Sequence, residues 1–295
     1  MTKDTYTHSQ QELNQSKKYD LEIKKHYDKV AETDKDSPSS TMADLYIREN
    51  ETKFIENQIE KFTSLQKSEY RFSGDCATGP GKNDKFTILD VGCGNGYTLE
   101  ILLNTFPNLD FQGIEFNDSL RQIASNRFTN KKIQISNGDI RNISTLPKEK
   151  VDILICQRVL INLLDENDQK SALNNLIELV NSGGLLIFIE CFKSGLDNLN
   201  SARQEFELDD LPPAHHNLYL SDEFFQHISL KEFDNTQREL FSTHYFISRV
   251  LHQTFLMANK KTFFRNSHFV SFFSGAFPKN VGDYSPLKPL SFKKI

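Results

Sequence analysis

The chain has no tryptophan, only four cysteines and no long apolar run. A membrane-spanning helix needs roughly 20 consecutive apolar residues, and no stretch comes close to that, so no transmembrane helix is expected. The first 18 residues are polar and lack the apolar segment of a secretory signal peptide. These absences predict a cytoplasmic protein with no membrane partner.

An excess of positive charge is also missing. Lys and Arg number 35 against 40 Asp and Glu, which gives a formal net charge of −5. Proteins that bind a nucleic-acid backbone usually carry a basic surface. We therefore expect a small-molecule partner and no nucleic acid.

The four cysteines, at positions 76, 93, 156 and 191, form no Cys-x-x-Cys pair. Three of them, Cys93, Cys156 and Cys191, lie at or just after the ends of apolar runs that resemble buried strands. No histidine or second cysteine lies near them at the spacing of a zinc site. They are interpreted as buried, reduced thiols, and no metal is predicted.

Composition divides the chain into five predicted segments: a disordered or loosely attached terminus (1–18), an N-terminal helical lid (19–72), a Gly-rich linker (73–85), a core (86–190), and an acceptor-binding cap with the last strands of the same domain (191–295). The lid pattern predicts amphipathic helices at 19–36 and 42–65.

Short apolar runs alternate with helical stretches in the core. Strands are predicted at 86–91, 111–115, 133–136, 151–157 and 185–190, and helices at 97–105, 118–127 and 168–181. The pair Gly183-Gly184 is expected to end the last helix and turn the chain into the next strand. This alternation indicates a parallel sheet with helices on both faces.

The rhythm is less regular beyond residue 190. The predicted elements there are helices at 197–208 and 221–228, a strand at 241–250, a helical insert at 250–258 and an edge strand near 285–292.

Residues 87–96 read Thr-Ile-Leu-Asp-Val-Gly-Cys-Gly-Asn-Gly, a strand followed by a tight turn and the start of a helix. Gly92 and Gly94 have no side chain to keep a ligand away from the backbone. The helix start presents free N–H groups to polar parts of that ligand. Alone, such a turn is weak evidence, but the strand and helix around it favour a ligand-binding turn.

The next two strands end in acidic residues that suit a nucleoside. Glu115 lies 19 residues beyond Gly96 (115 − 96), where a carboxylate can accept both hydrogen bonds of a ribose diol. Asp139 follows the third strand and can accept from an adenine amino group, while Ile140 packs on the ring.

A nicotinamide dehydrogenase uses similar parts, but its loop usually reads GxGxxG with a small last residue. Counted from Gly92, that last position is Tyr97, and counted from Gly94 it is Leu99. Neither fits. Asp90, two residues before the first glycine, is also more typical of methyltransferases.

Residues 86–190, with the motif Leu-Asp-Val-Gly-Cys-Gly-Asn-Gly, resemble the class I S-adenosylmethionine-dependent methyltransferases. The resemblance implies a Rossmann-like, doubly wound, mostly parallel α/β sheet of the seven-stranded methyltransferase type, ending in an antiparallel hairpin. It also implies S-adenosylmethionine as methyl donor and S-adenosylhomocysteine as product. The candidate cofactor contacts are Asp90, Gly92, Cys93, Gly94, Glu115, Phe116, Asp139, Ile140 and Gln157, with Arg48 of the lid at the cofactor carboxylate.

Three further segments, 39–44, 158–163 and 216–220, resemble a bacterial subgroup often found with surface-polysaccharide or sugar biosynthesis. This resemblance implies a sugar, or a phosphorylated or nucleotide sugar, as the acceptor.

Methyl transfer is an in-line displacement at an activated carbon, so the protein must align the nucleophile and exclude water. A hydroxyl acceptor also benefits from a general base. His216 is the first candidate for that base, and Glu190, at the end of the fifth strand, is the second. A plain surface loop explains His215 and His216 equally well.

The candidate acceptor-binding residues are Tyr27, Arg158, His215, Asn217, Tyr245 and Arg249. On the predicted strand at 241–250, alternation places Tyr245 and Arg249 on one face and His244 on the other. Arg249 can hold an anionic acceptor or form a surface ion pair.

Together these features predict a monomeric or homodimeric O-methyltransferase of a sugar or another polar small molecule. Three alternatives stay open: an N-methyltransferase of a small metabolite, a catalytically silent binding or regulatory protein, and an oxidoreductase. Methylation of nucleic-acid base amines is disfavoured, because the chain reads Gln157-Arg158-Val159-Leu160 where such enzymes carry an Asp/Asn-Pro-Pro-aromatic motif. Carboxylates for a catechol-type metal site are also missing there until Asp165 and Glu166.

Overall fold

A computed structural model describes residues 20–73, 85–226 and 228–295 of the chain. The predictions for residues 1–18 and for all but the ends of the 73–85 linker lie outside these residues. Among the helices described, none is long and apolar enough to span a bilayer.

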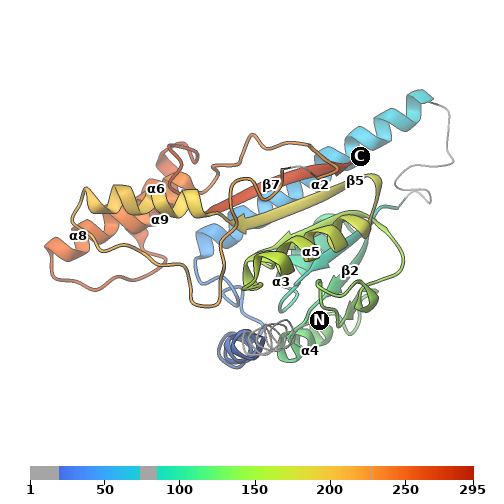
Figure 1. Cartoon of the computed structure of the whole chain (residues 1–295), viewed down its shortest axis with the longest axis horizontal. Helices are drawn as coiled ribbons and strands as arrows, with labels where there is room; N and C mark the ends of the chain where they lie inside the picture. Colours follow the sequence, from blue (N-terminus) through green and yellow to red (C-terminus); the bar gives the residue numbers. More distant parts are fainter. Residues whose placement is uncertain (1–19, 74–84, 227) are drawn as a thin grey trace, which may run out of the picture.

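The centre of the structure is a seven-stranded sheet in the order β3-β2-β1-β4-β5-β7-β6 (Figure 1). Its strands are β1 (Thr87–Val91), β2 (Asp110–Ile114), β3 (Gln134–Ser136), β4 (Val151–Gln157), β5 (Val180–Cys191), β6 (Leu230–Glu232) and β7 (Leu287–Lys294). The first five strands run parallel, and β7 lies antiparallel between β5 and β6. The predicted fold, a doubly wound, mostly parallel methyltransferase-type sheet, is confirmed.

The connections between the parallel strands are the predicted helices. These are α3 (Tyr97–Thr105), α4 (Asp118–Arg127) and α5 (Glu166–Glu178), with short 3-10 helices η1 (Ile143–Thr145) and η2 (Leu160–Asn162). The run Leu185–Cys191 of β5 is buried at every position. Strands that helices cover on both faces consist of continuous apolar residues. The strands of the core could therefore be predicted from the sequence.

Two helices precede the sheet. Residues 20–34 are helical and lie beside α4, where Asp28 accepts hydrogen bonds from Asn117 and Ser119 (Figure 1). The second helix is α2 (Leu45–Ser73), which packs against α3, β5 and β7. Its inward face carries apolar side chains at helical spacing: Phe54, Ile55, Ile59 and Phe62, each at most 1% exposed.

The C-terminal part forms a lobe at one end of the molecule. It consists of α6 (Lys193–Gln204), α7 (Ser242–Phe246), the π-helix η3 (Ile247–Leu251), α8 (His252–Ala258) and α9 (His268–Ala276). In Figure 1, α6, α8 and α9 lie together at the left, away from β2 and α4.

The prediction of a strand at 241–250 is wrong, because this segment is helical from α7 through η3. Its aromatic and β-branched composition favours a strand. The side chains of Thr243, Ile247 and Val250, however, are buried at spacings of three and four, so packing of one helical face decides the conformation.

Three smaller expectations also differ from the structure. Residues 222–226 form turns rather than a helix. Gly183-Gly184 lies inside β5, where the pairing shifts register between Val180 and Leu185 and Gly183 adopts a φ of +75°. The C-terminal strand β7 is an inner strand, because β6 pairs with its outer side.

Phe62 tests the packing of α2 on the sheet. Its ring is 0% exposed and contacts Phe86 and Phe233 at 5.9 and 6.0 Å between ring centres. We expect Phe62→Ala to lower the free energy of unfolding by about 3–5 kcal/mol in denaturant titrations. Leu65→Ala, on the exposed side of the same helix, should change it by no more than about 0.5 kcal/mol. Equal effects of the two substitutions would contradict this packing.

Candidate active site

A cavity opens at the carboxyl ends of β1, β2 and β4. Its wall combines the turn after β1, the residues that follow β2 and β3, the loop after β4, and parts of helix 20–34 and α2. Ligands of doubly wound sheets bind at this edge, beside the point where the strand order reverses. All ten predicted cofactor residues line this cavity.

The turn after β1 depends on three glycines in the left-handed region. Gly92, Gly94 and Gly96 have φ values of +68°, +58° and +78°. A Cβ on Gly92 would lie 2.4 Å from Val159, and one on Gly96 would lie 2.7 Å from Phe128. A Cβ on Gly94 would meet nothing closer than 3.6 Å. Gly92 and Gly96 are therefore needed for packing, whereas Gly94 is needed for its backbone conformation.

Glu115 closes this turn from the end of β2. Its carboxylate is 7% exposed; Oε2 accepts from Gly94 N at 2.8 Å and Oε1 accepts from Asn117 N at 2.7 Å. Burial raises the pKa of Glu115, against the effect of these hydrogen bonds. Each carboxylate oxygen can accept more than one hydrogen bond, so Glu115 can still accept from two hydroxyls.

Asp90, within β1, brings a second carboxyl group to the floor of the cavity. It is 2% exposed, and burial, with the nearby Glu115, raises its pKa to about 8. Arg48 opposes this shift. A carboxyl group in this condition favours a cationic group beside it, such as an ammonium. The neighbouring Cys93 is a buried free thiol, as are Cys156 and Cys191, as predicted.

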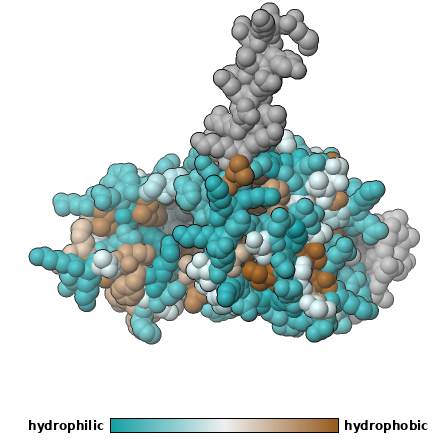
Figure 2. All heavy atoms as spheres, turned by 90° about the horizontal axis from the view of Figure 1, so that it is seen from below, coloured by the Kyte–Doolittle hydropathy of each residue, from teal (hydrophilic) through white to brown (hydrophobic). Residues whose placement is uncertain are grey.

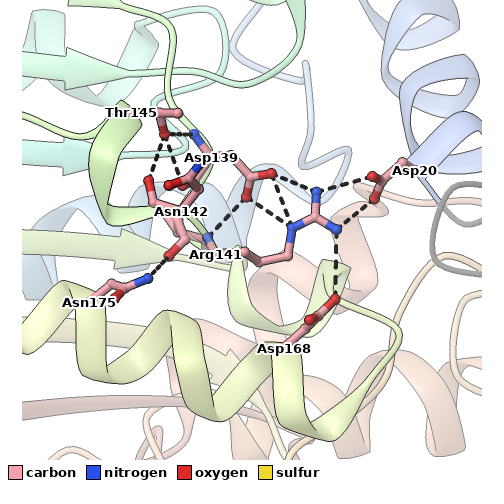
Figure 3. A network of polar contacts seen from close by, with 8 residues as sticks. Asp20, Asp139, Arg141, Asn142, Thr145, Asp168 and Asn175 are labelled. Atoms are coloured by element: carbon pink, nitrogen blue, oxygen red, sulfur yellow. Dashed lines mark hydrogen bonds and ion pairs between the residues drawn. The ribbon is translucent and has the colours of Figure 1, made fainter. Parts of the chain in front are cut away.

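The far corner of the cavity contains Asp139, Ile140 and Arg141, which follow β3 (Figure 3). Arg141 donates to Asp139 from Nε at 2.9 Å and from Nη2 at 2.7 Å, and to Asp20 of helix 20–34 at 2.9 and 3.1 Å. It also forms an ion pair with Asp168 of α5 at 3.7 Å. Although burial opposes it, the bond with Arg141 holds the pKa of Asp139 below its usual range. Arg141 thus fixes helix 20–34 against the corner predicted for adenine.

The α2 side of the cavity is also charged. Arg48 donates to the backbone at Pro38 and Ser40 and to Thr41 Oγ1. Burial, then the nearby Arg158, lowers its pKa to about 10. Arg48 therefore both lines the cavity and holds the 38–41 loop.

Glu51 connects α2 to the end of β4. Its carboxylate pairs with Arg158 and accepts from Gln157 Nε2 at 2.7 Å. The guanidinium of Arg158, a predicted acceptor ligand, is therefore already engaged by Glu51.

Tyr27 reaches the cavity from helix 20–34. Its hydroxyl accepts from Asn162 Nδ2 at 2.9 Å, and burial raises its pKa to about 12. The phenol therefore keeps its proton at neutral pH and can donate a hydrogen bond into the cavity.

Glu190 does not line the cavity. It is 0% exposed and accepts from the backbone N–H groups of Val159, Leu160 and Ile161 at 2.9, 3.0 and 3.3 Å. Burial raises its pKa to about 7. This arrangement corrects the expectation of a base at Glu190: the residue positions the loop after β4.

His216 and His215 lie in a turn just outside the cavity wall. The ring of His216 lies 6.2 Å from that of Tyr27, and burial lowers its pKa to about 4. The next residue, Asn217, donates to Asn162 at 3.3 Å. These residues border the cavity, on the side of Tyr27, without lining it.

Tyr245 and Arg249 are not part of the wall either. Arg249 and His244 both contact Asp44, at 3.5 and 3.0 Å. The predicted placement of His244 on the opposite face is wrong because the segment is a helix. Arg249 instead helps to anchor the C-terminal lobe to the segment before α2.

Sequence reasoning missed several wall residues: Asp20, Lys24, Thr41, Tyr97, Thr98, Asn117, Arg141 and Asn162. Lys24, for example, lies 5.0 Å from the ring of Phe116. The helical charge pattern of 19–36 predicted a helix but not which of its faces meets the cavity.

A model of a methyltransferase domain family matches residues 88–184, the segment that holds the turn, Glu115 and Asp139. This part of the chain is therefore similar to methyltransferase domains. The match indicates S-adenosylmethionine as the cofactor, in agreement with the prediction.

Individual relatives cover only part of the chain. A malonyl-[acyl-carrier protein] O-methyltransferase from Acetivibrio thermocellus is 26% identical over 173 residues, which are 55% of this chain and 59% of the relative. One from Bacillus anthracis is 31% identical over 106 residues, covering 36% and 38%. The chain therefore spans less than two thirds of the relatives it matches.

Among solved structures, an S-adenosylmethionine-bound amino pentose methyltransferase from Micromonospora echinaspora is 21% identical, with a TM-score of 0.32 over 44% of this chain and 49% of that one. An N-methyltransferase from Bradyrhizobium japonicum is 20% identical, with a TM-score of 0.33 over 46% and 62%.

Asp90 makes the stability of the domain depend on pH. Because its folded pKa is raised, the stability that it contributes is complete below the usual carboxyl pKa and is lost as pH rises through about 8. Between about pH 6 and pH 9, melting temperatures should therefore fall less steeply for Asp90→Asn than for the unchanged protein. Asp110→Asn, at an exposed carboxyl of β2, should follow the unchanged protein. Parallel curves for all three proteins would contradict the assignment to Asp90.

Proposed function

We propose that this protein is an S-adenosylmethionine-dependent methyltransferase that methylates an oxygen of a sugar or another polar small molecule. The observation that supports it most is one cavity that joins the left-handed glycine turn, Glu115 and the Asp139-Ile140 pair at the carboxyl ends of the strands. A catalytically silent binding protein would have no need for an acceptor space beside them.

The residues present fit the cofactor. Gly94 leaves the backbone open, since a Cβ there meets nothing within 3.6 Å. The Glu115 carboxylate can accept from the ribose hydroxyls, and Asp139 with Ile140 suits the adenine. Burial and Glu115 raise the pKa of Asp90 despite the nearby Arg48, so an amino acid ammonium beside this carboxyl would favour its charged form. Arg48 would hold the carboxylate of the same group.

S-adenosylmethionine, when bound, supplies a methyl group on an activated sulfonium. The chain then has to orient the acceptor and exclude water. Helix 20–34, held by Arg141, covers the cavity as the proposed lid. Tyr27 and Asn162 present neutral hydrogen-bonding groups on the lid side, which suit hydroxyls.

A proton must leave a hydroxyl acceptor. His216 remains the proposed base because of its place beside Tyr27. Burial lowers its pKa to about 4, so the imidazole is neutral at neutral pH, but the same shift makes it a weak base in the absence of bound acceptor. Its ring lies 6.2 Å from that of Tyr27, so it borders the acceptor side of the cavity. Asn217 and His215 belong to the same proposed rim, and residues 191–295 to the proposed cap.

A second candidate acceptor is a carboxylate carried on a carrier protein. Two relatives are named for that activity, and residues 252–282 contain no Asp or Glu but four cations, Lys260, Lys261, Arg265 and Lys279. Exposed aromatic side chains accompany them, including Phe264 and Phe272. Figure 2 shows apolar side chains exposed at the left end of the molecule, which holds α8 and α9. This surface would suit an acidic carrier.

Transfer of a labelled methyl group from S-adenosylmethionine tests the proposal. We expect label on sugars or nucleotide sugars with the unchanged protein. Gly94→Asp should reduce transfer by on the order of 100-fold, because an unpaired charge beside buried Glu115 costs about 3 kcal/mol. Gly183→Asp has the same left-handed backbone and nothing within 4 Å, so it should keep activity.

The acceptor panel separates the candidates. Label only on carrier-bound acids would favour the second candidate, and label only on amines would move the proposal to N-methylation. Label on no acceptor, with the cofactor still bound, would support the silent binding protein and overturn the proposed activity.

A further inference from the structure

Three histidines from two distant segments meet beside the cavity. His26 lies on helix 20–34, and His215 and His216 form a turn 189 residues further along the chain (215 − 26). The ring nitrogens that they offer all lie within 4.8 Å of one another. The rings of His26 and His216 are stacked at 3.8 Å, and the ring of His215 lies edge-on to both, at 5.9 and 5.0 Å.

One of these rings also has an unused nitrogen. Nδ1 of His216 is buried without a hydrogen-bond partner among the described residues. An unpaired buried nitrogen costs free energy, and a ligand would remove that cost.

We propose that His26, His215 and His216 bind one divalent transition-metal ion, for which Zn²⁺ is the best fit. Imidazole nitrogen suits Zn²⁺, Ni²⁺ and Co²⁺ rather than Mg²⁺ or Ca²⁺. Zn–N bonds of about 2.0–2.1 Å in a tetrahedron place the nitrogens about 3.4 Å apart. His215 is exposed and can rotate toward the other two rings. The stacked rings of His26 and His216 must also tilt apart, so that one nitrogen of each faces the ion. Three histidines leave the fourth position to water.

No metal was expected from the spacing of the cysteines or from the residues after the fourth strand. The three histidines form no motif in the sequence, because only folding brings position 26 next to positions 215 and 216. None of the three residues lines the cofactor cavity, so metal binding and cofactor binding can be measured separately. An ion bound at His216 would occupy the imidazole proposed above as the base, so these two roles of His216 exclude each other.

A bound ion would join helix 20–34, the proposed lid, to the turn at 215–216. Helix 20–34 contributes Asp20, Lys24 and Tyr27 to the cavity wall. The turn at 215–216 continues into Leu218, whose N–H donates to Ile161 O at 2.7 Å in the loop after β4. A metal bridge from the helix to this turn would therefore hold helix 20–34 near its middle, six residues (26 − 20) beyond Asp20, which contacts Arg141.

The test uses the untagged full chain, freed of metal with a chelator and titrated with Zn²⁺ by calorimetry and with Co²⁺ by absorbance. We expect one ion per chain, a raised melting temperature, and slower tryptic cleavage at the exposed Lys25 and Lys29 of helix 20–34. His215→Ala should weaken binding at least tenfold, and the addition of His26→Gln and His216→Gln should abolish it.

His268→Ala is the matched control, because this histidine is exposed at the start of α9, outside the set. It should bind the ion as the unchanged protein does. Circular dichroism verifies that each variant is folded. No ion bound by the unchanged protein, or equal affinity in the folded triple variant, would overturn the metal site.

Discussion

The turn between β1 and α3 is the constraint on which the rest of this site depends. Gly92, Gly94 and Gly96 all occupy a backbone region that other residues enter only with strain. Because Gly92 has no side chain, Val159 can pack directly on the turn, and the loop after β4 comes close to the end of β1. The Gly94 N–H then fixes Glu115. One backbone path thus sets the spacing of three strand ends.

A second set of contacts is electrostatic, and it joins helix 20–34 and α2 to the residues that follow β3 and β4. Arg141 links Asp20 of helix 20–34 to Asp139 (Figure 3), while Glu51 of α2 engages Arg158 after β4. Glu51 and Arg158 are largely buried, the Arg141 set is partly buried, and each charge has a partner. Helix 20–34 is therefore held at the Asp139 corner by directional contacts.

The core could be predicted from the sequence because its strands are apolar on both faces and alternate along the chain with helical segments of ordinary length. The prediction for residues 241–250 was wrong, because their aromatic and β-branched side chains belong to a helix of the C-terminal lobe and not to a strand. Sequence reasoning could locate Glu115 and Asp139, which follow strands directly. It could not locate Arg141, Glu51 or Asn162 as site residues, because their partners come from segments far away in the chain.

The same reasoning explains why the acceptor is harder to infer than the cofactor. Cofactor residues lie at strand ends, whose positions the sheet dictates. The proposed acceptor residues come from helix 20–34 and from the 214–217 turn, whose placement depends on tertiary contacts such as Asn217 with Asn162. Glu190 shows that a carboxyl at a strand end is not always part of the site: it accepts hydrogen bonds from the backbone of the loop after β4.

Calorimetric titration of the purified full chain with S-adenosylhomocysteine, and in parallel with NADH, tests the central claim most directly. The account predicts saturable binding of one S-adenosylhomocysteine per chain and no binding of NADH, because Tyr97 and Leu99 stand where a dinucleotide loop needs a small residue. Binding of NADH without binding of S-adenosylhomocysteine would contradict it.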